Sequence, residues 1–360
     1  MFMNWTIEVV MNLIAVPLFF FGFYVSLRQI LKGQNYHFYY FSTFAWLGYM
    51  LFFLFTALAV ILLSVTLLKI ALLISSFADI CFLGKVDTLK RESVEPIKLA
   101  ILSMLIVMGV IFIAFFPNAV YISTFVSGDL TVKYDLYLGA IIGLQYLLPV
   151  VYYVIYTKEL LAKAPQSLKH DATRYFLGVF FCLIAIITMI SGIMQVLPGI
   201  LALLGAIGAV LMVSAYGKQP KLLFILPFKA LRLVVMDTES GISLFTHTWN
   251  AGSNLIDDDL FTGMLQGINS IVKESVKRGA VQEIRMADAI IMTSYDNRYP
   301  IACVLIATNP SKSLRDSLHL FAQQFTTRYN TCFDNYNEVS QFSGASDMIN
   351  ACFPFVPVYD

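Results

Sequence analysis

Charged residues are scarce in this chain of 360 residues, since they make up 13% of it while 58% is hydrophobic. An ordinary soluble domain contains about 25% charged residues. The shortage is concentrated before Lys218, where apolar runs of about 20 residues recur, and a run of that length spans a bilayer. The composition therefore argues against a wholly soluble protein and predicts the lipid bilayer as a partner. The formal net charge of +1 gives no reason to expect a nucleic-acid partner.

Sequence motifs for catalysis and cofactor binding are also lacking. The chain contains no GxxxxGK(S/T) phosphate loop, no GxGxxG, no HExxH and no GxSxG. Its four histidines are scattered, and its five cysteines include no CxxC pair that would indicate a metal site or a redox pair. We therefore predict a protein that is not an enzyme, with no cofactor and no catalytic or metal-binding residues.

Seven apolar segments predict seven membrane-spanning helices. Apolar residues run almost unbroken from Phe38 to Gly84, about twice the length that one span needs, so we place a break at Ser64-Val65-Thr66. The predicted spans are Thr6–Leu31, Phe38–Leu63, Thr66–Gly84, Pro96–Pro117, Leu136–Leu161, Thr173–Val196 and Gly199–Tyr216.

Basic residues are unevenly divided between the two sides of these spans. One side offers only Lys69 and Lys133, whereas the loops after spans one, three, five and seven are rich in Lys and Arg. Cytoplasmic loops carry such an excess. We therefore predict a multi-pass protein of the cell membrane with its N-terminus outside and its C-terminal part in the cytoplasm. The basic loop residues are Arg28, Lys32, Lys85, Lys90, Arg91, Lys98, Lys158, Lys163, Lys169, Arg174, Lys218, Lys221, Lys229 and Arg232.

A few polar residues inside the predicted spans are candidates for an intramembrane ligand site, because polar groups in a bilayer are costly. The fifth span carries a polar stripe at helical spacing, which could line a cavity. The competing interpretation is interhelical packing with tyrosine hydrogen bonds and a kink at Pro149. The candidates are Asn12, Asp79, Gln145, Tyr152, Tyr153, Tyr156 and Gln195.

The segment 218–229 links a predicted membrane domain, residues 1–217, to a predicted cytosolic domain, residues 230–360. Pro220 and Pro227 stop the last helix from continuing. The apolar stretch Leu222–Phe228 could lie at the lipid head groups or pack on the cytosolic domain itself. In the first case Lys218, Lys221, Lys229 and Arg232 would contact the membrane surface.

The periodicity after Arg232 predicts an α+β domain, in which one antiparallel sheet is covered by long helices. A hairpin comes first, followed by a helix, three more strands and a second helix, which is the order ββαβββα. The predicted strands are 231–237, 242–249, 282–287, 289–295 and 299–308, and the helices cover Asp257–Lys277 and Ser313–Arg328.

This domain resembles the longin fold, a profilin-like relative of the roadblock domain. The resemblance is carried by RLVVMDTESGISLFTHTW, LFTGMLQGINSIVKESVKRGAVQEIRMADAIIM, YPIACVLIATNPSKSLRDSLHLFAQQF and the tail CFPFVPVY, which look like archaeal, Asgard-type membrane proteins. The membrane part resembles, more loosely, the seven-helix sensor region of histidine kinases, through KELLAKAPQSLKHDATRYFLGVFF. Longin-like domains serve as platforms for small GTPases and trafficking proteins.

The resemblance implies a receptor-like or scaffold membrane protein that presents its longin-like domain to a cytoplasmic partner, with a small GTPase expected first. The exposed faces of the two predicted helices are the candidate binding surfaces, and a homodimer is left open. The alternative is a transporter or channel with a regulatory cytosolic domain. An intramembrane enzyme that depends on Asp79 is a third interpretation.

Overall fold

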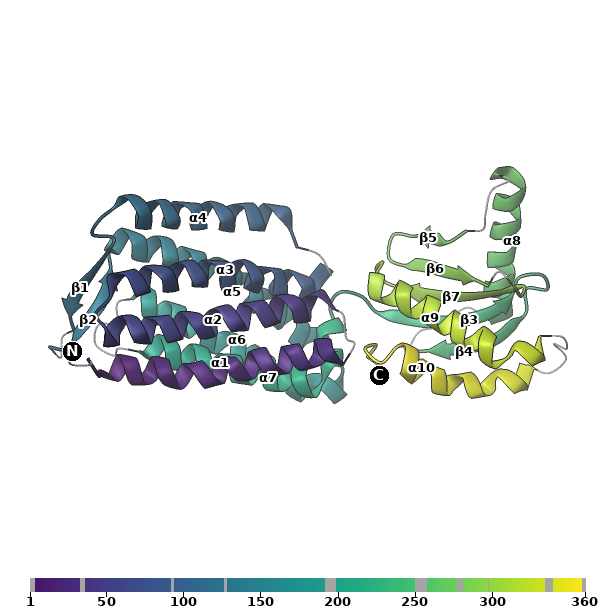
Figure 1. Cartoon of the computed structure of the whole chain (residues 1–360). Coiled ribbons are helices and arrows are strands. Elements are labelled where there is room, and N and C mark those ends of the chain that lie inside the picture. Colours follow the sequence, from purple (N-terminus) through teal and green to yellow (C-terminus); the bar gives the residue numbers. More distant parts are fainter. Residues whose placement is uncertain are drawn as a thin grey trace. The chain divides into compact units, whose positions relative to one another are not determined.

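The computed structural model describes residues 4–32, 36–91, 94–125, 128–191, 199–249, 258–276, 281–296, 298–333 and 339–357. The chain forms two compact units, Met1–Leu223 and Phe224–Asp360 (Figure 1). The boundary between them falls inside the predicted linker.

Seven helices of the first unit are long and apolar enough to cross a membrane, which confirms the predicted number. They pack as a bundle along a common direction (Figure 1). Their bounds are α1 Ile7–Leu31, α2 His37–Ile61, α3 Val65–Arg91, α4 Pro96–Phe115, α5 Leu136–Lys163, α6 Lys169–Ile190 and α7 Ile200–Lys218.

The long apolar run between α2 and α3 is interrupted where the sequence predicted a break. Leu63 adopts a left-handed conformation with φ of 48°, which a non-glycine residue rarely takes and which no helix continues through. The hydroxyl of Ser64 then accepts a hydrogen bond from the Leu67 amide at 3.4 Å and caps the start of α3.

The third helix is longer than predicted, and this changes the place of one basic residue. The prediction ended the span at Gly84 and put Lys85 in a loop, but α3 continues to Arg91. Lys85 therefore lies inside the helix and is fully buried. The prediction was wrong because a lysine was assumed to mark the end of the membrane segment.

A short antiparallel hairpin, which the sequence analysis missed, joins α4 to α5. Its strands are β1 Val120–Thr124 and β2 Leu130–Tyr134. Gly128 turns the chain with φ of 89°. The side-chain amide of Asn4 donates to the Leu130 carbonyl at 2.7 Å and ties the start of the chain to the hairpin. We call this end of the bundle, where the N-terminus also lies, the hairpin end (Figure 1).

The second unit is built on an antiparallel sheet with the strand order β4-β3-β7-β6-β5. This confirms the predicted antiparallel α+β architecture. The central strands β3 and β7 are almost wholly buried, as their apolar sequences require. The elements in chain order are β3 Ala230–Asp237, β4 Ser243–Thr248, α8 Asp258–Val276, β5 Glu283–Arg285, β6 Ile290–Tyr295, β7 Ile301–Ala307, α9 Lys312–Arg328 and α10 Ser346–Cys352.

The apolar stretch before β3 belongs to the second unit from Phe224 onward. The rings of Phe224 and Phe228 lie 4.9 and 6.0 Å from the ring of Phe355, in the C-terminal tail. The side-chain amide of Asn309 also donates to the Pro227 carbonyl at 3.2 Å. This part of the predicted linker therefore packs on the α+β unit itself, which was one of the two expected arrangements.

Candidate functional site

The most polar site inside the bundle is centred on Asp79, in the middle of α3. One carboxylate oxygen accepts a hydrogen bond from the Tyr49 hydroxyl of α2 at 2.6 Å, and the other accepts from the Gln145 amide of α5 at 2.5 Å. The same amide donates to the Ser76 hydroxyl at 3.2 Å. Asp79 and Gln145 are both buried, and these hydrogen bonds offset the cost of placing a carboxyl group in the core.

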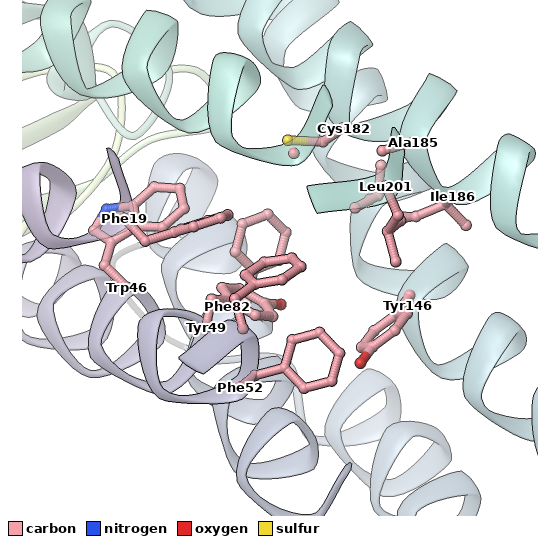
Figure 2. A pocket seen from close by; sticks show the side chains of 13 residues that line it. Phe19, Trp46, Tyr49, Phe52, Phe82, Tyr146, Cys182, Ala185, Ile186 and Leu201 are labelled. Carbon is pink, nitrogen blue, oxygen red and sulfur yellow. The ribbon is translucent and has the colours of Figure 1, made fainter. Parts of the chain in front are cut away.

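An apolar cavity of about 90 Å³ lies next to this site. Figure 2 shows aromatic side chains of α1, α2 and α3 on one side of the cavity and side chains of α5, α6 and α7 on the other. Tyr49 belongs to both the cavity and the Asp79 site. A volume of this size holds a few water molecules or a small apolar group. The lining residues are Phe19, Trp46, Tyr49, Phe52, Phe53, Phe82, Tyr146, Val150, Cys182, Ala185, Ile186, Leu201 and Gly205.

Lys85 forms a second unusual feature of the bundle, because its ammonium nitrogen is buried and has no hydrogen-bond partner. The nitrogen lies 4.0 Å from the centre of the Trp46 ring. Four more rings lie within 5.8 Å, those of Phe82, Tyr153, Phe38 and Tyr216. Trp46 and Phe82 also line the cavity. Aromatic faces attract a cation, so this cage accommodates the amine without a carboxylate.

Tyr216 of α7 connects this cage to α1 and α2. Its hydroxyl accepts a hydrogen bond from the Trp46 indole at 3.0 Å and lies 2.8 Å from the Ser26 hydroxyl and 3.2 Å from that of Ser42. The three helices are thus joined through one phenol oxygen. A change in the spacing of α7 against α1 and α2 would break these bonds together.

A third polar cluster lies where α3, α4 and α5 meet. The ammonium of Lys98 contacts the carboxylates of Asp87 and Glu95, both at 2.9 Å, and donates to the Tyr156 hydroxyl at 2.5 Å. The Tyr152 ring lies 4.4 Å from the same nitrogen. Lys98 and Asp87 are buried, so each charge depends on the other.

The structure thus divides the predicted polar stripe of α5 among the three sites. Gln145 meets Asp79, Tyr152 and Tyr156 meet Lys98, and Tyr153 borders the cage and lies 2.5 Å from the Tyr175 hydroxyl of α6. Asn12 is buried in α1 and makes none of the hydrogen bonds described above. Gln195 lies outside the described residues.

The residues predicted to touch the membrane surface differ in their exposure. Lys218 is exposed, and Lys221 and Lys229 are half-buried. Arg232 lies in β3 and is buried, with its guanidinium 5.9 Å from the centre of the Phe261 ring.

The sequence analysis missed Tyr49, Lys85 and Tyr216 as members of these sites. Nothing in the spacing of Tyr49 or Tyr216 distinguishes them from ordinary aromatic packing residues. Lys85 had a usable signal, since a basic residue between the apolar runs around Phe82 and Val86 is unusual even near the end of a span.

Comparisons with known proteins assign no family to this chain, because no family model, no curated protein and no solved structure matches it. In the part of the chain that the structure describes, no three His, Cys, Asp or Glu side chains come close enough to hold a metal ion. The geometry of the bundle suits ligand sensing or helix coupling, because its buried polar groups join helices to one another around a small cavity.

Proposed function

We propose that the protein is a receptor-like membrane protein that presents its longin-like α+β unit to a cytoplasmic protein, with a small GTPase the first candidate. In this proposal the seven helices hold the unit at the inner face of the membrane. The bundle would respond to a ligand through the cavity beside Asp79. The network around Tyr216 would pass the response to α7, which leads directly into the second unit.

A single observation carries the binding role, and it is an apolar stripe on the exposed face of α8. Leu260, Met264 and Ile271 are 68%, 45% and 66% exposed and lie on one face of the helix, whereas Phe261 and Leu265 face the sheet. Exposed apolar side chains that align along a helix mark interaction surfaces. Asp257 and Lys277, at the ends of the predicted binding face, lie outside the described residues.

The proposal is tested with the full-length protein in lipid nanodiscs and a panel of small GTPases, each loaded with GDP or a GTP analogue. We expect one GTPase to bind in one nucleotide state. Leu260→Glu and Ile271→Glu should weaken that binding at least tenfold, because a charge in an apolar interface costs several kcal/mol. Leu320→Glu is the matched control, since Leu320 is exposed on α9.

Two outcomes would count against this proposal. One is that no GTPase binds in either nucleotide state. The other is that binding is unchanged by the two α8 substitutions, which would remove the stripe from the interface. If Leu320→Glu alone abolished binding, the face of α9 would be the binding surface and the assignment to α8 would be wrong.

A transporter or channel is the second candidate, because Asp79 is a buried carboxyl group in the middle of a span. Ion or solute flux into vesicles that contain the protein would support it. The flux should fall when Gln145 or Tyr152 is substituted. Absence of flux for a panel of ions and amino acids would favour the receptor-like role.

A further inference from the structure

A groove of about 560 Å³ lies at the hairpin end of the bundle. It is formed where the start of α1, the start of α5 and the end of α6 meet the hairpin, and its lining includes Glu8, Leu136 and Ile190. Helix ends of a membrane bundle lie at the level of the lipid head groups. The groove is therefore placed where the polar and apolar parts of a lipid meet.

Glu8 supplies an acidic group to the groove. Its carboxylate accepts a hydrogen bond from the Thr131 hydroxyl at 2.7 Å, and it forms no ion pair within the described residues. Lys133 also lines the groove, but its ammonium donates to the Thr124 carbonyl at 2.9 Å and lies 4.9 Å from the centre of the Phe125 ring. The carboxylate of Glu8 can therefore accept a further cation.

Aromatic side chains surround the same region. Tyr121, Phe125 and Tyr134 line the groove together with Glu8. Burial raises the pKa of Tyr134 to about 12, and the nearby carboxylate of Glu8 adds to the effect. The site is thus poorly hydrated and electron-rich. Aromatic rings beside a carboxylate recognise amine and quaternary ammonium groups.

The other part of the groove is apolar and open to lipid. Leu136 and Leu144 of α5 and Ile190 of α6 line it and are 81%, 53% and 57% exposed. Leu136 and Leu144 are about 12 Å apart along the helix, so an acyl chain could follow this surface toward the bilayer centre. An occupant that comes from the bilayer fits such an opening better than one from water.

We propose that the groove binds a bilayer lipid whose head group carries an amine or ammonium, with that head group against Glu8 and the aromatic rings. Its acyl chain lies between α5 and α6. The site stands independently of the partner proposed for the α+β unit, because it depends only on the first unit.

The experiment measures lipid binding to the full-length protein by native mass spectrometry in detergent. Phosphatidylcholine, phosphatidylethanolamine and phosphatidylglycerol with identical acyl chains are compared. We expect the two ammonium-bearing lipids to bind about tenfold more tightly than phosphatidylglycerol, as one desolvated cation–carboxylate and aromatic contact allows. Glu8→Gln should remove this preference, and Glu159→Gln, the same change near the opposite end of the bundle, should keep it.

A second variant tests the apolar half and does not alter any charge. Ala140 is exposed and lines the groove, so Ala140→Trp should fill it and reduce the binding of all three lipids. Equal binding of phosphatidylglycerol by the unmodified protein would overturn the proposal. So would an unchanged preference in Glu8→Gln, or unchanged binding in Ala140→Trp. If Glu8→Gln did not fold, the head-group preference of the unmodified protein and the Ala140→Trp result would still decide.

Discussion

At the scale of single residues, the bundle contains buried charged groups of three kinds. Asp79 is satisfied by neutral donors, Lys98 by carboxylates and a phenol, and Lys85 by aromatic rings alone. The free energy of unfolding should respond differently when each is replaced. A buried group with partners leaves those partners unsatisfied when it is removed, whereas a group without partners does not.

Asp79→Leu should lower stability more than Asp79→Asn. Asparagine can accept from the Gln145 amide and donate to the Tyr49 oxygen, whereas leucine leaves the Tyr49 hydroxyl without its acceptor at a cost of about 2 kcal/mol. We expect the unfolding midpoint of Asp79→Leu in detergent to be about 4–8 °C lower, measured by a thiol-reactive dye. Asp135→Asn is the control, because asparagine also caps α5. Equal midpoints for the two Asp79 variants would contradict the hydrogen-bond assignment.

Lys85→Met should leave stability unchanged or raise it, while Lys98→Met should lower it by about 3–5 kcal/mol. Methionine fills the aromatic cage without the cost of burying an amine, but loss of Lys98 leaves the buried carboxylate of Asp87 without its cation. The same thermal assay compares the two variants. A Lys85→Met protein as unstable as Lys98→Met would show that the cage stabilises the ammonium by more than its desolvation costs.

At the scale of elements, periodicity and hydropathy predicted the long helices and the strands of the α+β unit, since both depend on neighbouring residues. The hairpin β1–β2 was not predicted, because its strands are five residues each and lie in what hydropathy marks only as a loop. The end of α3 was misplaced for a related reason. Only the rings of four other elements make a helical position for Lys85 acceptable.

The start of the α+β unit makes a prediction about its minimal fragment. A fragment 224–360 should be more stable than 230–360 by about 3–6 kcal/mol, because the shorter one loses the buried rings of Phe224 and Phe228. Urea denaturation monitored by circular dichroism measures the difference. A fragment 218–360 is the control and should match 224–360. If 230–360 were as stable as 224–360, these rings would add nothing to the core of the unit.

At the scale of the whole molecule, the seven helices are long and apolar enough for a multi-pass membrane protein, and the direction of insertion remains a prediction from the basic loops. The hairpin end should face outward and the α+β unit should face the cytoplasm. This arrangement is required by the proposed GTPase partner. It would also place the lipid groove in the outer leaflet.

Two single-cysteine variants test this orientation in intact cells. Asp129 lies in the turn of the hairpin and Glu239 in the turn between β3 and β4, and both are exposed. A membrane-impermeant maleimide should label Asp129→Cys in intact cells and label Glu239→Cys only after permeabilisation. The unmodified protein, with five cysteines, gives the background. The reverse pattern of labelling would invert the topology and exclude a cytoplasmic partner for the α+β unit.

The sequence by itself determined the number of apolar helices, the place where the bundle ends and the antiparallel α+β character of the second unit. These features follow from local hydropathy and periodicity, which any stretch of ten to twenty residues carries on its own. The tertiary structure decided which polar groups meet. Tyr49, Asp79 and Gln145 come from α2, α3 and α5, and the cage of Lys85 draws on α2, α3, α5 and α7. Such meetings depend on the packing of distant segments, which no local pattern encodes.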